Sequence, residues 1–256
     1  MRTLIIYLML AVSCSAWAST AKDTFQLAND AFATGDVDRA IALYEHLTAR
    51  KLISHELFYN LGTAHAERES WGAARFYMEK AFFENPGHEQ IQHNLRLIKE
   101  QVDDTHRFPQ YPFFASIASI HSQLGQKFLG LGLLILLYSI GILMMLNLLK
   151  TIPRTKIYLS VLGGLLVVNG FLLIMEYTYV GFHTKMGIVT KDGTELFPHP
   201  DASTEPNAYL SAGSKARVNE SVGPWSKVDL ADGSVGWLQT EKIVLMSANT
   251  FSNSST

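Results

Sequence analysis

The sequence predicts a multi-part membrane protein that combines an all-α repeat domain, two transmembrane helices and a small all-β domain. Three observations predict this fold class. Two long apolar runs lie in the middle of the chain, an internal repeat precedes them, and glycines, turns and β-branched residues follow them. The net charge is only -2 over 256 residues, and neither soluble part is basic, so no nucleic-acid partner is expected.

The first 18 residues resemble a secretory signal peptide, because Arg2 precedes an apolar stretch and Ala16 and Ala18 frame a small-residue cleavage motif. Cleavage after Ala18 removes Cys14, the one cysteine of the chain, and leaves no thiol for disulfides, catalysis or metal binding. Residues 10–14 also resemble a lipobox faintly. Cys14 is therefore either removed with the signal peptide or lipidated.

Residues 21–102 carry an internal repeat with a period of 34 residues, which aligns position 40 with position 74. The alignment pairs residues of similar size that are expected where two helices meet: Leu27 with Leu61, Ala28 with Gly62, Ala40 with Ala74, and Tyr44 with Met78. Small residues let paired helices touch and large ones fill the seam, so each of the two repeats is expected to form two helices. A helix over 89–102, with Ile91, Leu95 and Ile98 on one face, is expected to cap the stack.

The second repeat resembles the tetratricopeptide repeat family, through Asn60, Leu61, Gly62, Ala74, Ala81 and Pro86. The resemblance implies a short superhelical stack whose concave face binds peptide segments of partner proteins. Six residues are expected to line that face: Phe25, Asn29, Phe32, Tyr59, Asn60 and Thr63. Aromatic rings there favour a partly apolar peptide, or they pack on a neighbouring element. A carboxylate clamp is not expected, because Phe25, Gln90 and Asn94 replace the cations it needs.

Five histidines fall in the repeat region, but their spacing does not indicate a metal site. The five are His46, His55, His65, His88 and His93. No two of them stand four apart on one helix, and no HExxH motif is present. The sequence therefore predicts neither a metal nor another cofactor.

Residues 103–127 are a connector in which positions 113–120 form either an amphipathic helix in the headgroup layer or an ordinary linker. The runs 128–149 and 157–175 contain no charged residue and are long enough to cross a bilayer, so two spans are expected. The loop 150–156 carries three cations, which places it in the cytoplasm and both soluble domains outside. Glycines are expected to bring the two helices close together: Gly130, Gly132, Gly141, Gly163 and Gly164.

Residues 181–247 are predicted to form a small β domain. The expected strands of this domain are 187–189, 215–218, 225–230 and 235–238, with a tight hairpin at Asp232 and Gly233. The serine-rich tail 248–256 is expected to be disordered. The spacing of Trp225, Asp232, Gly233, Gly236 and Trp237 resembles bacterial SH3-like (SH3b) domains, which implies a five-stranded barrel. Three residues are candidates for ligand binding: Phe197, Trp225 and Trp237. The tryptophans either pack the barrel or line a ligand groove, and Phe197 replaces an arginine of many family members.

The order of the parts resembles BatE-type proteins of the Bat aerotolerance system. That resemblance implies a bacterial inner-membrane protein with two spans and both soluble domains in the periplasm. The bilayer, von Willebrand factor A domain proteins and a MoxR-type ATPase are its implied partners. The expected function is a non-enzymatic scaffold or adaptor in aerotolerance or envelope stress, and the alternative is an anchor or sensor that binds peptidoglycan through the SH3b domain. An enzyme is not expected, because no segment is left to house a catalytic centre.

Overall fold

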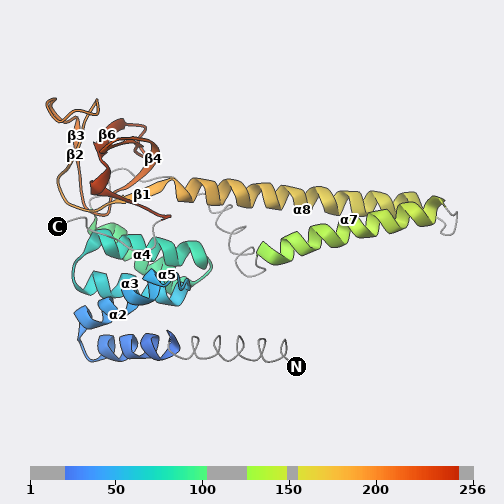
Figure 1. The fold of residues 1–256 in the computed structure, drawn as a ribbon, viewed down its shortest axis with the longest axis horizontal. Helices are drawn as coiled ribbons and strands as arrows, with labels where there is room; N and C mark the ends of the chain where they lie inside the picture. The colour runs from blue at the N-terminus through green and yellow to red at the C-terminus, as the bar shows by residue number, and fades with distance from the viewer. Residues whose placement is uncertain (1–20, 103–125, 149–154, 248–256) are drawn as a thin grey trace, which may run out of the picture. The chain divides into compact units, whose positions relative to one another are not determined.

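The computed structural model describes residues 21–102, 126–148 and 155–247 (Figure 1). The signal peptide, most of the connector, most of the basic loop and the tail predicted above therefore lie outside the described residues, while residues 155 and 156 of the loop are helical. The described chain divides into two compact units. One combines the N-terminal helices with the C-terminal strands, and the other holds the two apolar helices between them in sequence.

The N-terminal helices form the two predicted helix pairs and the capping helix. Residues 21–33 are helical, and α2 (Val37–Ala49), α3 (His55–Glu67), α4 (Trp71–Glu84) and α5 (Glu89–Gln101) follow. Gly35 takes a positive φ of 82°, and the Asp36 side chain accepts a hydrogen bond from Arg39 N to start α2. Ser54 caps α3 in the same way.

The helix seam is built largely as the repeat predicted. Ala28, Ala40 and Ala74 are fully buried, and a Cβ placed on Gly62 would lie 3.1 Å from the Met78 backbone nitrogen. The assignment of Leu27 to the seam is wrong, because this side chain is 52% exposed. Consecutive helical residues are rotated by about 100°, and Ala28 already occupies the buried side of this helix.

The C-terminal strands form a five-stranded antiparallel sheet in the order β6-β5-β4-β1-β7 and a separate β2-β3 pair. The strands are β1 (Met186–Val189), β2 (Thr194–Leu196), β3 (Ala208–Leu210), β4 (Lys215–Val222), β5 (Trp225–Asp229), β6 (Val235–Gln239) and β7 (Ile243–Leu245), with the 3-10 turn η1 (Thr240–Lys242) before β7. Gly233, with φ 90°, makes the predicted hairpin between β5 and β6.

The sheet does not stand apart from the helices, which overturns the prediction of a separate SH3-like barrel. Met186, Ile188, Val244 and Met246 belong to the same hydrophobic cluster as the core of the helical part. Figure 1 shows α4 between α3 and the strands. The residues of α4 are buried around the whole helix, because α3 and α5 cover one side and β1 covers another. The helices and strands therefore make one mixed unit of helices and antiparallel sheet.

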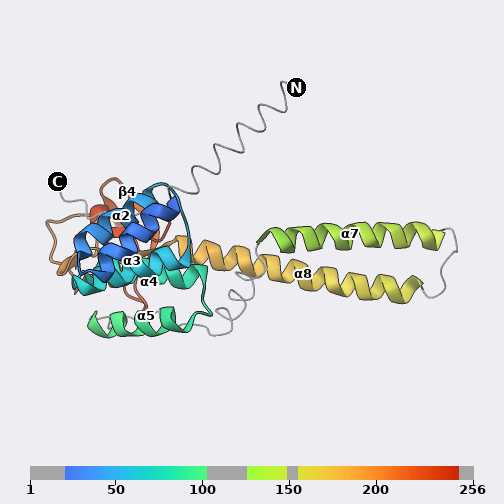
Figure 2. The ribbon, with the colours of Figure 1, turned by 90° about the horizontal axis from the view of Figure 1, so that it is seen from below.

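The second unit consists of α7 (Gln126–Leu148) and α8 (Thr155–Thr184), which lie side by side in both views (Figures 1 and 2). Of the described helices, α8 alone is long and apolar enough to cross a membrane, over Ile157–Ile174. The apolar described stretch of α7, Gly130–Leu146, is shorter, so the prediction of two spans is not upheld. Helix α8 also continues to Thr184, so residues 181–184, assigned above to the β domain, are helical.

Most of the glycines in these two helices do not bring the backbones together. A Cβ placed on Gly130, Gly141, Gly163 or Gly164 would meet nothing within 4 Å. Only at Gly132 would it approach the other helix, 3.5 Å from Asn169 Nδ2. The predicted small-residue interface is therefore wrong at four of its five positions.

Candidate functional site

The six residues predicted to line the concave helical face lie on two helices and are all half-buried. Phe25, Asn29 and Phe32 come from the helix over 21–33, and the remaining three, Tyr59, Asn60 and Thr63, come from α3. Asn29 and Asn60 meet across the two helices, with Asn60 Nδ2 donating to Asn29 Oδ1 at 3.0 Å. The structure thus brings two of the six together through a direct hydrogen bond.

Tyr44 adds a further hydrogen bond to this contact, and Asn94 and Tyr59 form a separate one. Tyr44 Oη donates to Asn29 Oδ1 at 2.7 Å, and Asn94 Nδ2 donates to Tyr59 Oη at 3.0 Å. Burial raises the pKa of Tyr44, with the nearby Asn60 side chain acting in the opposite direction, so its phenol is a neutral donor at ordinary pH. We call the set of Asn29, Tyr44, Tyr59, Asn60 and Asn94 the polar ladder.

The other predicted residues of this face have packing contacts. The rings of Phe25 and Tyr44 lie 5.9 Å apart, and Phe32 packs against the buried core. Thr63 Oγ1 donates to the carbonyl of Tyr59 within α3. Tyr44 and Asn94 were missed by sequence reasoning as members of the site. The repeat assigned Tyr44 to the seam, and Asn94 lies on the capping helix.

One histidine lies beside this face without having been predicted to do so. The His88 ring lies 6.4 Å from the Tyr59 ring and 5.8 Å from the His55 ring. Among the residues that the structure describes, no group of three histidines, cysteines or carboxylates is arranged to hold a metal ion. Aromatic and amide chemistry therefore characterises the described face.

The three candidates in the β part lie together, but one of them is a core residue. Phe197 is only 4% exposed, exchanges backbone hydrogen bonds of 2.7 Å with Trp237, and meets the Trp225 ring edge-on at 5.4 Å. Trp225 and Trp237 are half-buried. Lys227 Nζ lies 5.9 Å from the centroid of the Trp237 ring. Phe197 thus packs the sheet, and only the tryptophans offer partly open rings.

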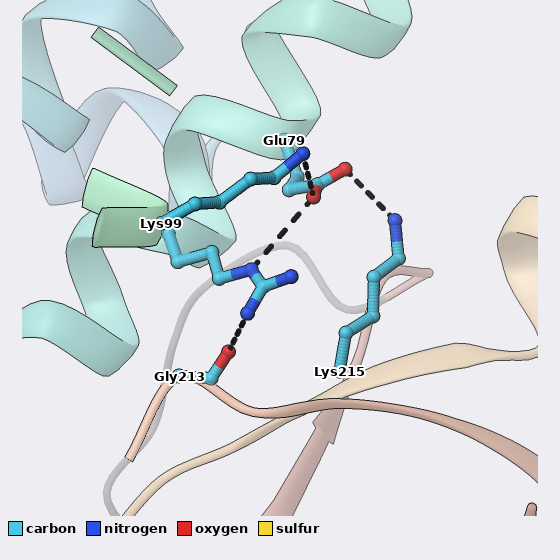
Figure 3. A network of polar contacts seen from close by, with 5 residues as sticks. Glu79, Lys99, Gly213 and Lys215 are labelled. Carbon is cyan, nitrogen blue, oxygen red and sulfur yellow. Dashed lines mark hydrogen bonds and ion pairs between the residues drawn. The ribbon is translucent and has the colours of Figure 1, made fainter. Parts of the chain in front are cut away.

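A buried group of charges joins the helical part to the strands, and sequence reasoning missed it (Figure 3). Glu79 Oε2 lies 2.8 Å from Lys215 Nζ of β4, while its Oε1 lies 3.6 Å from Lys99 Nζ of α5. Arg75 Nε is 3.8 Å from Glu79 Oε1, and Arg75 Nη1 donates to the carbonyl of Gly213 at 2.7 Å. We call these five residues, Arg75, Glu79, Lys99, Gly213 and Lys215, the charged joint.

The electrostatics of the charged joint favour an ionised Glu79. Burial acts to raise the pKa of this carboxyl group, but the positive charges of Lys215, Lys99 and Arg75 outweigh burial and hold the pKa well below its ordinary value. Burial lowers the pKa of Lys99, which the negative charge of Glu79 counteracts. Glu79 is therefore a fixed anion between cations from two parts of the fold.

The charged joint is suited to positioning the two parts relative to each other. Arg75 and Glu79 are 3% exposed, so removal of any partner would leave a charge in a dry environment. The backbone at Gly213 also approaches the helices closely, since a Cβ placed there would lie 2.8 Å from Val102 Cγ2. A sequence signal was present, because two opposite charges four residues apart lie within a helix that is otherwise largely apolar.

Comparison with known proteins adds no identification to this geometry. No protein-family model and no curated protein matches the chain.

Proposed function

We propose that the protein is a membrane-anchored, non-enzymatic adaptor whose helical face binds a segment of a partner protein. The observation that carries the proposal is the polar ladder, in which half-buried amides, the half-buried Tyr59 phenol and the buried Tyr44 phenol form two groups of hydrogen bonds between helices. Pre-positioned polar groups beside aromatic rings are typical of surfaces that bind peptides with a small entropic cost.

The apolar helix α8 supplies the anchor in this proposal. Its stretch Ile157–Ile174 is long enough to cross the hydrocarbon layer, and Lys150, Arg154 and Lys156 precede it in the sequence. The helical part shares a buried core with the strands that follow α8, which supports placing both in one compartment at the bacterial inner membrane.

The partners that we propose are membrane proteins of a Bat-type aerotolerance or envelope-stress assembly, including von Willebrand factor A domain proteins and a MoxR-type ATPase system. The support is the order of the sequence features. Because the helical part and the strands form one unit, a partner that contacts both gains a high effective concentration for the second contact. The peptidoglycan alternative has less support, because Phe197 is buried in the sheet.

Co-purification from membranes tests the proposal. A double variant, Phe32→Ala with Tyr59→Ala, removes one ring and one ladder phenol from the face. Recovery of the proposed partners is expected to fall, while a matched double variant on exposed positions, Leu52→Ala with Ile53→Ala, is expected to retain them. Unchanged partner recovery with a folded Phe32/Tyr59 variant would count against the helical face as the binding surface.

Purified sacculi separate the peptidoglycan alternative from the adaptor function. The full chain in detergent is mixed with sacculi, and Trp237→Ala is compared with the parent protein. Binding that depends on Trp237 and is unaffected by the Phe32/Tyr59 double variant would favour the alternative. The adaptor proposal expects little retention on sacculi.

A further inference from the structure

The charged joint holds more positive than negative charge. Three cations, Arg75, Lys99 and Lys215, lie 3.8, 3.6 and 2.8 Å from the carboxylate oxygens of Glu79. Of the described charges that act on the Lys99 amine, Glu79 favours its charged form, whereas Lys215 and Arg75 oppose it. Charges in a dry environment are costly unless counter-charges balance them. Three cations therefore share one anion, and the described side chains of the joint carry two positive charges in excess.

The two lysines form the side of the joint that solvent reaches. The side chains of Lys99 and Lys215 are 16% and 11% exposed, whereas those of Arg75 and Glu79 are 4% exposed. Lys215 Nζ donates one hydrogen bond of 2.8 Å to Glu79. Lys99 Nζ stays 3.6 Å from the same carboxylate, which is longer than the length of about 2.7–2.9 Å of a charge-assisted hydrogen bond. Because an ammonium group has three N–H donors, both lysines keep capacity for a further anion.

The two amines are held close together by the carboxylate that they share. Figure 3 shows Lys99 and Lys215 reaching the two oxygens of Glu79 from different sides, one from α5 and the other from β4. A tetrahedral oxyanion has oxygens for both amines, and lysine binds phosphate as a compact point charge. We infer that Lys99 and Lys215 form a binding site for a small, doubly negative oxyanion of the phosphate class at the edge of the charged joint.

The charge of the joint selects the occupant. The negative charge of Glu79 repels an incoming anion, but the three cations around it outweigh that repulsion. A doubly negative oxyanion balances the two excess positive charges, whereas a carboxylate or a phosphodiester leaves one of them unbalanced. An anion between Lys99 and Lys215 would also bridge α5 and β4, so its binding would stabilise the folded soluble unit.

The test uses the full chain in dodecyl maltoside, a detergent without phosphate. Inorganic phosphate is compared with dimethyl phosphate, which carries a single negative charge as the diester groups of many phospholipids do, and sodium chloride keeps the ionic strength constant. Thermal unfolding followed by tryptophan fluorescence and titration calorimetry are measured for the parent, Lys99→Gln, Lys99→Arg and Glu79→Gln. Lys22→Gln, on an exposed position of the first helix, is the matched control.

Phosphate should raise the unfolding midpoint of the parent and of Lys22→Gln by about 2–5 °C, in a saturable manner. Lys99→Gln should weaken phosphate binding by about tenfold, because it removes a charged donor, and Lys99→Arg should restore most of it. Dimethyl phosphate should bind the parent about tenfold more weakly than phosphate does. Glu79→Gln should gain a larger shift than the parent, because it removes the one negative charge that opposes binding. A purely structural role of Lys99 would produce none of these differences.

Three outcomes would overturn the inference. Equal shifts for the parent and Lys99→Gln, or shifts that never saturate, would indicate a general effect of salt on stability. Equal affinity for dimethyl phosphate would exclude a doubly negative ligand and point to a lipid head group. Asp103 and Asp104 directly follow Val102 in the sequence, so the double variant Asp103→Asn with Asp104→Asn is also measured. A phosphate effect in this variant alone would show that carboxylates of the chain itself balance the joint.

Discussion

Lys215 Nζ lies 2.8 Å from Glu79 Oε2 although the two residues are 136 positions apart in the sequence. Glu79 belongs to α4 and Lys215 opens β4, so this bond joins segments that precede and follow the apolar helices. Together with the shared apolar cluster, it makes the helical part and the strands one unit. Predictions on stability and ionisation follow from this arrangement.

Substitution of Glu79 should strongly destabilise the soluble unit. Glu79→Gln leaves the cations of the charged joint buried without their counter-charge, and the expected loss is about 3–5 kcal/mol in the free energy of unfolding. Chemical denaturation of the full chain in detergent, followed by tryptophan fluorescence, measures it. Glu195→Gln on the exposed side of β2 should change little. If Glu79→Gln behaved like Glu195→Gln, the charged joint would contribute no stability.

The double variant Glu79→Met with Lys215→Met should be more stable than Glu79→Met alone. The second substitution removes one of the cations that the first leaves unpaired and replaces it with apolar volume. When Lys215→Met alone is measured as well, the unfolding free energies of the parent, the two single variants and the double variant give the coupling between the two residues. Additive effects would show that the 2.8 Å contact has no energetic role.

Acid should reduce the stability that the charged joint contributes to the folded chain. The pKa of Glu79 is lower in the folded chain than in the unfolded chain, so the unfolded chain binds its proton more readily. The stabilisation is therefore complete above the unfolded pKa of about 4.3 and is lost as the pH falls below that value towards the lower folded pKa. Unfolding curves from pH 7 to pH 3 should show a smaller loss of stability for Glu79→Gln than for the parent.

The amine of Lys80 should titrate near pH 8. Burial lowers its pKa to about 8, and Glu84 acts to raise it. Competitive acylation with acetic anhydride across a range of pH, read by mass spectrometry, should give a midpoint near 8, against about 10.4 for a free lysine side chain. Glu84→Gln should lower the midpoint further. A midpoint above pH 10 would contradict the effect of burial.

Glycine at position 62 should be difficult to replace. A Cβ there would lie 3.1 Å from Met78 N and 3.2 Å from the Ala74 carbonyl oxygen, and these backbone atoms cannot move away as a side chain can. Gly62→Ala should cost about 1–3 kcal/mol of stability despite the better helix propensity of alanine. Glu67→Ala, on an exposed position of the same helix, serves as the control. Equal stability of the two variants would show that α3 and α4 can separate slightly without cost.

Several features of the fold were predictable because they depend on local chemistry. The hairpin residue Gly233 acts on its immediate neighbours, and the repeat identified the buried small residues Ala28 and Ala74. The error at Leu27 arose because a repeat shift relates equivalent positions without showing whether a further helix covers them. The repeat therefore predicted where the helices lie more reliably than it predicted which side chains of the helix over 21–33 are buried.

The charged joint and the mixed unit were not predictable in the same way. Pairing of Glu79 with Lys215 depends on the path of the whole chain, which no local pattern contains. The polar ladder was partly predictable, because Asn29 and Asn60 were both expected on the concave face, where they form a hydrogen bond. Tyr44 joins them from the following helix, where the repeat indicated only a packing role.

The shared core has a consequence for biosynthesis. Ribosomes make α4 long before Met186 and Ile188, the strand residues that complete its surroundings. Until then the newly made helices expose apolar surface, which favours aggregation or capture by chaperones. A premature stop codon directly after α8 would leave that surface permanently uncovered and make the truncated product a target for proteolysis.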